Sequence, residues 1–207
     1  MKKKRPFCVV RIVDDDAGVR DSYRFLVETE GWIVKTFNDA EDFIENNDPD
    51  VPGCAVLDVR MPGLSGLELQ DYLRKLSSSL PVIFISAHAN VEMVVRAIQH
   101  GALDFLPKPV NDAKLLAAIE KAVDLSLARQ EADETIRSLQ EKWASLSHRE
   151  KETARWVGQG QLNKVIADHM QITERTVQVH RANVYQKLGV KNAVELAKIL
   201  IQLGVSA

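Results

Sequence analysis

The chain has 207 residues, which is long enough for two small domains. Of these residues 45% are hydrophobic and 6% aromatic, which is ordinary for a soluble globular protein. No apolar run approaches the roughly 18 residues of a membrane-spanning helix, so no membrane partner is expected. The formal net charge is −2, but residues 1–125 carry −5, 126–145 carry −1 and 146–207 carry +4, which indicates two tasks, the second involving a polyanion.

Apolar runs of strand length alternate with helical patterns over the first part of the chain. The first run follows a basic N-terminus that lacks a small-residue cleavage site, so it is interpreted as a strand and not as a signal peptide. The expected strands are 7–13, 32–37, 54–58, 81–86 and 103–107, and the expected helices are 17–30, 39–47, 66–77, 90–101 and 111–126. Five such units in series predict an α/β fold, namely a doubly wound, five-stranded parallel sheet with helices on both faces.

The remaining sequence is predicted to be helical. Residues 124–145 contain neither Gly nor Pro and many helix formers, which favours a linker helix. Further helices are expected at about 148–157, 162–169, 174–187 and 192–203, with Gly160 and Gly189 as plausible stops. Cys8 and Cys54 lie in apolar runs and are expected to be buried thiols in a reducing cytoplasm, not a disulfide.

Polar side chains follow the predicted strands where ligands bind in open parallel sheets, at the carboxyl ends of the strands. They are Asp14, Asp15 and Asp16 after the first strand, Asp58 and Ser86 ending the third and fourth, and Lys108 after the fifth. Carboxylates gathered in one cleft repel one another, and Mg2+ with an opposed lysine relieves that repulsion. The group predicts phosphoryl transfer to a carboxylate nucleophile, although Asp16 alone is better explained as a helix cap.

Two other phosphate-binding folds are disfavoured. A dinucleotide-binding domain needs a G-x-G-x-x-G motif after its first strand, and this chain has "DDDAGVRD" there. A haloacid-dehalogenase-type phosphatase has a second acid two residues after its nucleophile, and this chain has Arg60 there. Without that acid a fast general-acid hydrolase is unexpected.

Residues 7–125 resemble the receiver domain of bacterial two-component response regulators, through "VDDD" (13–16), "LDVRMPGLSG" (57–66), "FISAH" (84–88) and "GALDFLPKP" (101–109). The resemblance implies that Asp58 is the phosphoacceptor. It also implies that Mg2+, or Mn2+ in its place, is bound by Asp15, Asp58 and the backbone carbonyl of Arg60, with Asp14 contributing mainly through water. It makes Ser86 and Phe105 a switch pair, Lys108 a contact of the phosphoryl group and the Lys108–Pro109 bond cis. Arg60 and His88 occupy positions that tune dephosphorylation in such domains.

Residues 163–188 show a short amphipathic helix, a turn and a second helix with a polar, basic face. That order is typical of a helix-turn-helix DNA reader, but a small helical bundle with a solvated face fits the pattern equally well. Through "LSHRE" (146–150) and "NKVIADHMQITERTVQVHRANVYQKLGV" (163–190), residues 146–207 resemble the four-helix LuxR-type DNA-binding domain, and the whole chain resembles the NarL/FixJ class of regulators.

That resemblance implies which side chains meet DNA. Those expected to face bases are Gln178, Val179 and Ala182, and those expected at or beside phosphates are Lys164, Thr173, Arg175, Thr176 and His180. Arg181 and Asn183 would supply base contacts or lie at the rim. The last helix would contribute to a dimer contact or to the core through Val194, Ala197, Leu200 and Ile201.

Together these features predict a cytoplasmic transcription regulator with a receiver domain (1–125), a helical linker (126–145) and an all-α helix-turn-helix domain (146–207). The expected partners are a sensor histidine kinase, double-stranded promoter DNA, RNA polymerase and a second copy of the chain in a homodimer. No enzymatic turnover is expected. Two alternatives stay open: a phosphatase or phosphotransferase that uses Asp58, and a regulator whose DNA binding ignores phosphorylation.

Overall fold

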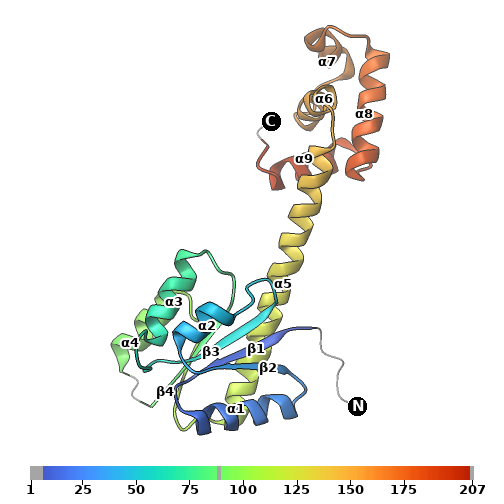
Figure 1. The fold of residues 1–207 in the computed structure, drawn as a ribbon. Coiled ribbons are helices and arrows are strands. Elements are labelled where there is room, and N and C mark those ends of the chain that lie inside the picture. The colour runs from blue at the N-terminus through green and yellow to red at the C-terminus, as the bar shows by residue number, and fades with distance from the viewer. Residues whose placement is uncertain (1–6, 88–89, 206–207) are drawn as a thin grey trace. The chain divides into compact units, whose positions relative to one another are not determined.

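A computed structural model describes residues 7–87 and 90–205 and divides the chain after Gln130 into two compact units. The first unit contains the strands β1 (Val9–Val13), β2 (Ile33–Phe37), β3 (Gly53–Asp58), β4 (Val82–Ser86) and β5 (Asp104–Pro107) (Figure 1). All neighbouring strands are parallel, in the order β2-β1-β3-β4-β5. This order places a topological switch point between β1 and β3, where ligands bind in such sheets.

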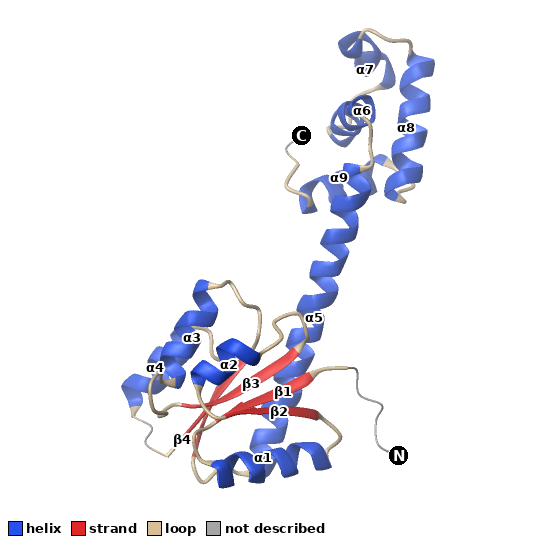
Figure 2. Cartoon of the chain, in the orientation of Figure 1, coloured by secondary structure: helices blue, strands red, loops and turns tan. Residues whose placement is uncertain are grey.

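Helices cover both faces of this sheet (Figure 2). They are α1 (Ala17–Thr29), α2 (Ala40–Asn46), α3 (Gly66–Lys75), α4 (Val91–Gln99) and α5 (Asp112–Ala144). Successive strand residues point to opposite faces, so Val10 and Ile12 pack with α1 and α5, whereas Val13 packs with α2 and α3. The predicted doubly wound α/β fold is therefore confirmed, with a separate apolar core on each face of the sheet.

One charged side chain lies inside this fold. Arg11 of β1 is 2% exposed, and its guanidinium donates to the carbonyl oxygens of Val9 at 2.9 Å, Asp48 at 2.8 Å and Val51 at 2.7 Å. Burial lowers the pKa of Arg11, and the bonds satisfy its donors. Arg11 thereby fixes the loop that leads into β3, the strand that ends in Asp58.

The second unit is all-α. Its helices are α6 (His148–Gly158), α7 (Asn163–Met170), α8 (Glu174–Leu188) and α9 (Ala193–Gln202). Ser147 begins α6 in a reciprocal capping box with Glu150, and Thr173 caps α8 by accepting from the amide of Thr176 at 3.2 Å. The backbone turns left-handed at Gln171, between α7 and α8, and at Gly189, after α8. These four helices enclose a third apolar core.

The observed helices and strands end close to the predicted positions. Helical residues were expected over 111–126 and 124–145, and the structure joins them, because α5 runs from Asp112 to Ala144 as one continuous helix. The expected cis Lys108–Pro109 bond is confirmed. Cys8 and Cys54 are buried and form no disulfide, and burial raises the pKa of Cys54 to about 12. Among the described residues no helix is long and apolar enough to span a membrane.

Candidate functional site

The carboxyl ends of the parallel strands deliver the predicted polar residues to one edge of the sheet. Asp14 follows β1, Asp58 ends β3 and Lys108 follows β5. The β1–β3 register pairs Val13 with Leu57, so the residues that follow them, Asp14 and Asp58, lie side by side. Sequence alone predicted this convergence because parallel strands all end at the same edge.

Lys108 joins the two carboxylates. Its Nζ lies 2.7 Å from Oδ2 of Asp14 and 2.6 Å from Oδ1 of Asp58, which are 1% and 5% exposed as residues. The other oxygen of Asp58, Oδ2, accepts a hydrogen bond from the backbone N–H of Arg60 at 2.6 Å. Oδ1 of Asp14 accepts from the N–H of Asp16 at 3.0 Å. The two acids are thus held in fixed positions by charge-assisted hydrogen bonds.

Burial controls the protonation of this group. Desolvation raises the pKa of Asp58, and neighbouring Asp14 raises it further, while the contacts with Lys108 and Arg60 oppose the rise. Burial lowers the pKa of Lys108, but its bonds to Asp14 and Asp58 outweigh burial and raise it overall. Lys108 is therefore a full positive charge placed against a carboxylate that its surroundings make more basic.

The donor set suits a hard divalent cation. Two buried carboxylates share one ammonium, which leaves a negative charge uncompensated at a cluster of oxygen atoms, the ligands that Mg2+ prefers. Asp15, expected among the ligands, is exposed. Within the described ranges no group of three or more acidic, His or Cys side chains is arranged to hold a metal. Asp14 and Asp58 are therefore the pair that the structure brings together.

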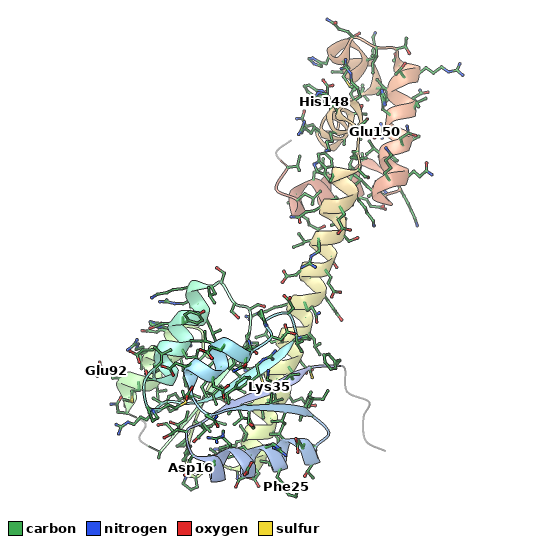
Figure 3. All side chains as sticks on the ribbon, viewed as in Figure 1. Asp16, Phe25, Lys35, Glu92, His148 and Glu150 are labelled. Carbon is green, nitrogen blue, oxygen red and sulfur yellow. The ribbon has the colours of Figure 1, made fainter. Side chains whose placement is uncertain are left out.

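Asp16 has a different role from its two neighbours. Its carboxylate accepts hydrogen bonds from the amides of Gly18 at 2.8 Å and Val19 at 3.1 Å, at the start of α1 (Figure 3). These bonds satisfy two N–H groups that the first helical turn leaves without partners. The prediction that Asp16 is a helix cap is confirmed.

The two predicted switch residues differ in exposure. Ser86 is 2% exposed, and its carbonyl oxygen accepts from the N–H of Lys108 at 2.8 Å. Phe105 is half-buried against the α2–α3 side of the sheet, with its ring centroid 5.9 Å from that of Phe84. The outer face of the Phe105 ring is therefore open to solvent. His88 lies outside the described residues.

A polar surface on α7 and α8 holds the second group of predicted residues. Lys164, Arg175, Gln178, Val179 and Ala182 are exposed, with Val179 at 54%. Val179 is apolar yet largely exposed to solvent. Such a side chain on a helix that enters the major groove can contact a thymine methyl.

The remaining predicted contacts of this surface are partly engaged within the protein. Thr176 and His180 are half-buried, and the hydroxyls of Thr173 and Thr176 lie 2.9 Å apart. The Thr173 hydroxyl also caps α8. Thr173 is itself exposed, so only Thr176 and His180 lie partly away from the exposed group.

Two basic residues on α8 bind side chains of the same unit. Lys187 is exposed, yet its Nζ forms an ion pair with the buried carboxylate of Glu150 at 2.7 Å, which lowers the pKa of Glu150. Arg181 donates to the hydroxyl of Tyr185 at 2.9 Å and to Asn163 at 3.2 Å. The partners lie on other helices or a turn away, so the sequence pattern did not reveal them.

Helix α9 divides its predicted residues between the core and the surface. Leu200 is 2% exposed and belongs to the third core, so its alternative assignment to a dimer contact is wrong. Val194 and Ile201 are 66% and 78% exposed, and Ala197 is half-buried. The exposed pair is the part of α9 that remains available to a partner.

Comparisons with known proteins match both units. Residues 10–120 match the response regulator receiver domain, and residues 144–200 match the luxR family of bacterial regulatory proteins. The chain is 36% identical to the transcriptional regulatory protein FixJ of Bradyrhizobium diazoefficiens, over 95% of this chain and 96% of that one. It is 38% identical to the response regulator protein TodT of Pseudomonas putida, over 94% and 86%. The solved structure of the response regulator StyR superposes with a TM-score of 0.88 and 42% identity, over 95% of this chain and all of that one.

Proposed function

Because the chain belongs to the NarL/FixJ family of response regulators, which regulate transcription in a phosphorylation-dependent way, we propose that Asp58 is the phosphoacceptor. The observation that carries this proposal is the placement of the Asp58 carboxylate between Lys108 and the Arg60 amide, at the switch point of the sheet. We further propose a receiver over 1–125, a linker over 126–145 and a DNA-binding domain over 146–207.

The proposed reaction is phosphoryl transfer from a sensor histidine kinase. A carboxylate oxygen of Asp58 attacks phosphorus, and the bond between phosphorus and the imidazole nitrogen of the kinase breaks, leaving the electron pair on that nitrogen. Lys108 offsets the charge of the phosphoryl oxygens. Receiver domains generally bind Mg2+ at this site, and here Asp14 and Asp58, with Asp15 and the Arg60 carbonyl, would hold Mg2+ or Mn2+. The metal would neutralise charge on the transferring group.

Phosphorylation would change the shape of a nearby surface. An acyl phosphate adds a doubly charged group with new acceptor oxygens, and Ser86 would donate to one of them. Phe105 would turn into the space that Ser86 leaves. Between these residues lies α4, whose Val91, Val95 and Ile98 are exposed and apolar, which supports dimerisation through this helix. The proposed homodimer would act in the cytoplasm on promoter DNA, with RNA polymerase as a further partner.

The DNA contacts are proposed on the exposed surface of α7 and α8. Gln178 would pair with adenine and Val179 would contact a thymine methyl, while Lys164 and Arg175 would meet phosphates. The net charge of +4 over 146–207 supports only weak binding by one copy, so dimerisation would contribute much of the affinity.

Gln178→Ala is expected to weaken binding to the operator about tenfold and to relax the base preference at one position, because a bidentate base contact is lost. Arg175→Ala is expected to weaken binding to all sequences alike and to reduce the salt dependence by about one unit of slope. Fluorescence anisotropy on operator and unrelated DNA measures both effects. Gln202→Ala, an exposed glutamine on α9, is the control and should bind like the wild type. Equal losses on both DNAs for Gln178→Ala would contradict a base contact.

Two alternative functions make different predictions. A phosphatase or phosphotransferase would turn over many phosphodonor molecules per chain, whereas the proposed regulator takes one phosphoryl group on one aspartate and hydrolyses it slowly. Arg60, two residues after Asp58, supports slow hydrolysis because no general acid stands there. A regulator that ignores phosphorylation would bind its operator equally well in both states.

Genome-wide mapping of bound DNA tests the proposal as a whole. The wild type is expected to occupy a set of promoters with two-fold symmetric sites, and Asp58→Asn is expected to lose most of that occupancy. Unchanged occupancy in the variant would reject phosphorylation control while leaving DNA binding intact.

A further inference from the structure

Helix α4 connects the two proposed switch residues, because Ser86 ends the strand before it and Phe105 lies in the strand after it. Ala97 is its buried residue, and the side chain of Glu92 projects outward near its start (Figure 3). A helix that buries so little apolar surface is held weakly by packing. Met93 also packs partly against the core, and polar contacts to α3 add to this packing.

Two consecutive residues of α3 supply such contacts, both to the C-terminal half of α4. Nε2 of Gln70 donates to the carbonyl oxygen of Ala97 at 3.0 Å. The carboxylate of Asp71 accepts from Nη2 of Arg96 at 2.8 Å, and its other oxygen lies 2.7 Å from Nδ1 of His100, the residue that caps α4. One carboxylate thus holds two successive turns of the helix.

The charge of Asp71 is the centre of this arrangement. Burial raises the pKa of Asp71, but the hydrogen bonds from Arg96 and His100 outweigh burial and lower it, so the carboxylate is ionised at neutral pH. Gln70 contributes less, because its Oε1 is buried and has no hydrogen-bond partner among the described residues. The α3–α4 contact therefore combines an ion-pair network with a half-satisfied amide, which favours a helix that is held but can be released.

We propose that Asp71 is a positioning residue that latches α4 to α3 in the unphosphorylated protein and sets how readily Ser86 and Phe105 rearrange. This proposal rests on phosphorylation of Asp58. It adds that the contacts of Asp71 oppose the rearrangement that phosphorylation of Asp58 causes. Inward movement of Ser86 and Phe105 pulls on both ends of α4, and the contacts of Asp71 oppose that pull. Removing them lowers the free energy needed to reach the phosphorylated arrangement.

The first test is backbone hydrogen exchange in the unphosphorylated full-length chain. Asp71→Asn is expected to raise the exchange rate of α4 amides roughly threefold, the size expected when a partly exposed ion pair is lost. Arg74→Gln is the matched control: Arg74 pairs with the same carboxylate at 3.6 Å, but both residues lie on α3. It should leave α4 unchanged. Asp71→Glu keeps the charge and is expected to restore slow exchange, whereas a loss of fold would raise exchange throughout the sheet.

The second test measures coupling. With a limiting small phosphodonor, Asp71→Asn is expected to form dimers at a smaller fraction of labelled Asp58 than the wild type, as measured by sedimentation and intact mass in the same samples. If Asp71→Asn matches Arg74→Gln in both exchange and dimerisation, the latch is overturned. If the wild type takes up no label, the phosphoacceptor assignment fails instead, and the exchange comparison still decides the latch.

Discussion

Asp58→Asn is expected to abolish phosphoryl incorporation from a small phosphodonor in the presence of Mg2+. Asparagine has the same shape and can still accept from the Arg60 amide, but its neutral amide is a poor nucleophile towards phosphorus. The variant also removes one of the two negative charges that Lys108 bridges. Intact-mass spectrometry after incubation with the phosphodonor measures the loss.

Asp16→Asn is the control for this experiment. Asp16 is close in sequence to Asp14, but its carboxylate caps α1, and asparagine caps helices equally well. This variant is expected to be labelled at the wild-type rate. Undiminished labelling of Asp58→Asn would show that another residue is the nucleophile.

Gly66→Ala is expected to slow labelling of Asp58 sharply and to lower the free energy of unfolding by about 2 kcal/mol, as overpacking does in a dense interior. A Cβ on Gly66 would lie 2.1 Å from the carbonyl oxygen of Asp58 and 3.3 Å from the ring of Phe84. The oxygen belongs to the backbone, so it can move away only by shifting Asp58, the proposed nucleophile. Urea denaturation and intact-mass labelling measure the two effects.

Gly18→Ala provides the comparison for Gly66→Ala. Gly18 also lies in the first turn of a helix, but a Cβ there would meet only Oδ1 of Asp16 at 3.2 Å, a side-chain atom that can move. Alanine also has the higher helix propensity, so stability should change by less than about 1 kcal/mol. If Gly66→Ala is as stable and as readily labelled as Gly18→Ala, the steric argument is wrong.

The fold of the first unit could be predicted because strand and helix patterns alternate without ambiguity. The run at 54–58, for example, differs from the observed β3 by one residue at its start. Continuity of α5 could not be predicted, because the core-facing pattern stops near Ser126 while helix-forming residues continue. The apolar pattern of a helix ends where the helix stops packing against the core. The helix itself continues for as long as its residues have high helix propensity, so the two boundaries differ.

The candidate site could be predicted as far as backbone topology determines it. Strand ends bring Asp14, Asp58 and Lys108 together in any sheet of this order. The exposure of Asp15 depends on how the chain turns into α1, which the sequence does not specify. The pairing of Lys187 with Glu150 joins residues on different helices of the second unit and required the packed structure.

The reaction rate of a buried thiol can report how often the sheet of this protein opens. Cys8 precedes β1 and Cys54 lies in β3, and they are the only cysteines in the sequence. With a pKa near 12, Cys54 is almost entirely unreactive while the core is closed, since the thiolate is the reactive form. Modification of Cys54 by a thiol reagent must therefore wait for β3 to separate from its neighbours, and its rate reports how often this part of the sheet opens without any engineered probe.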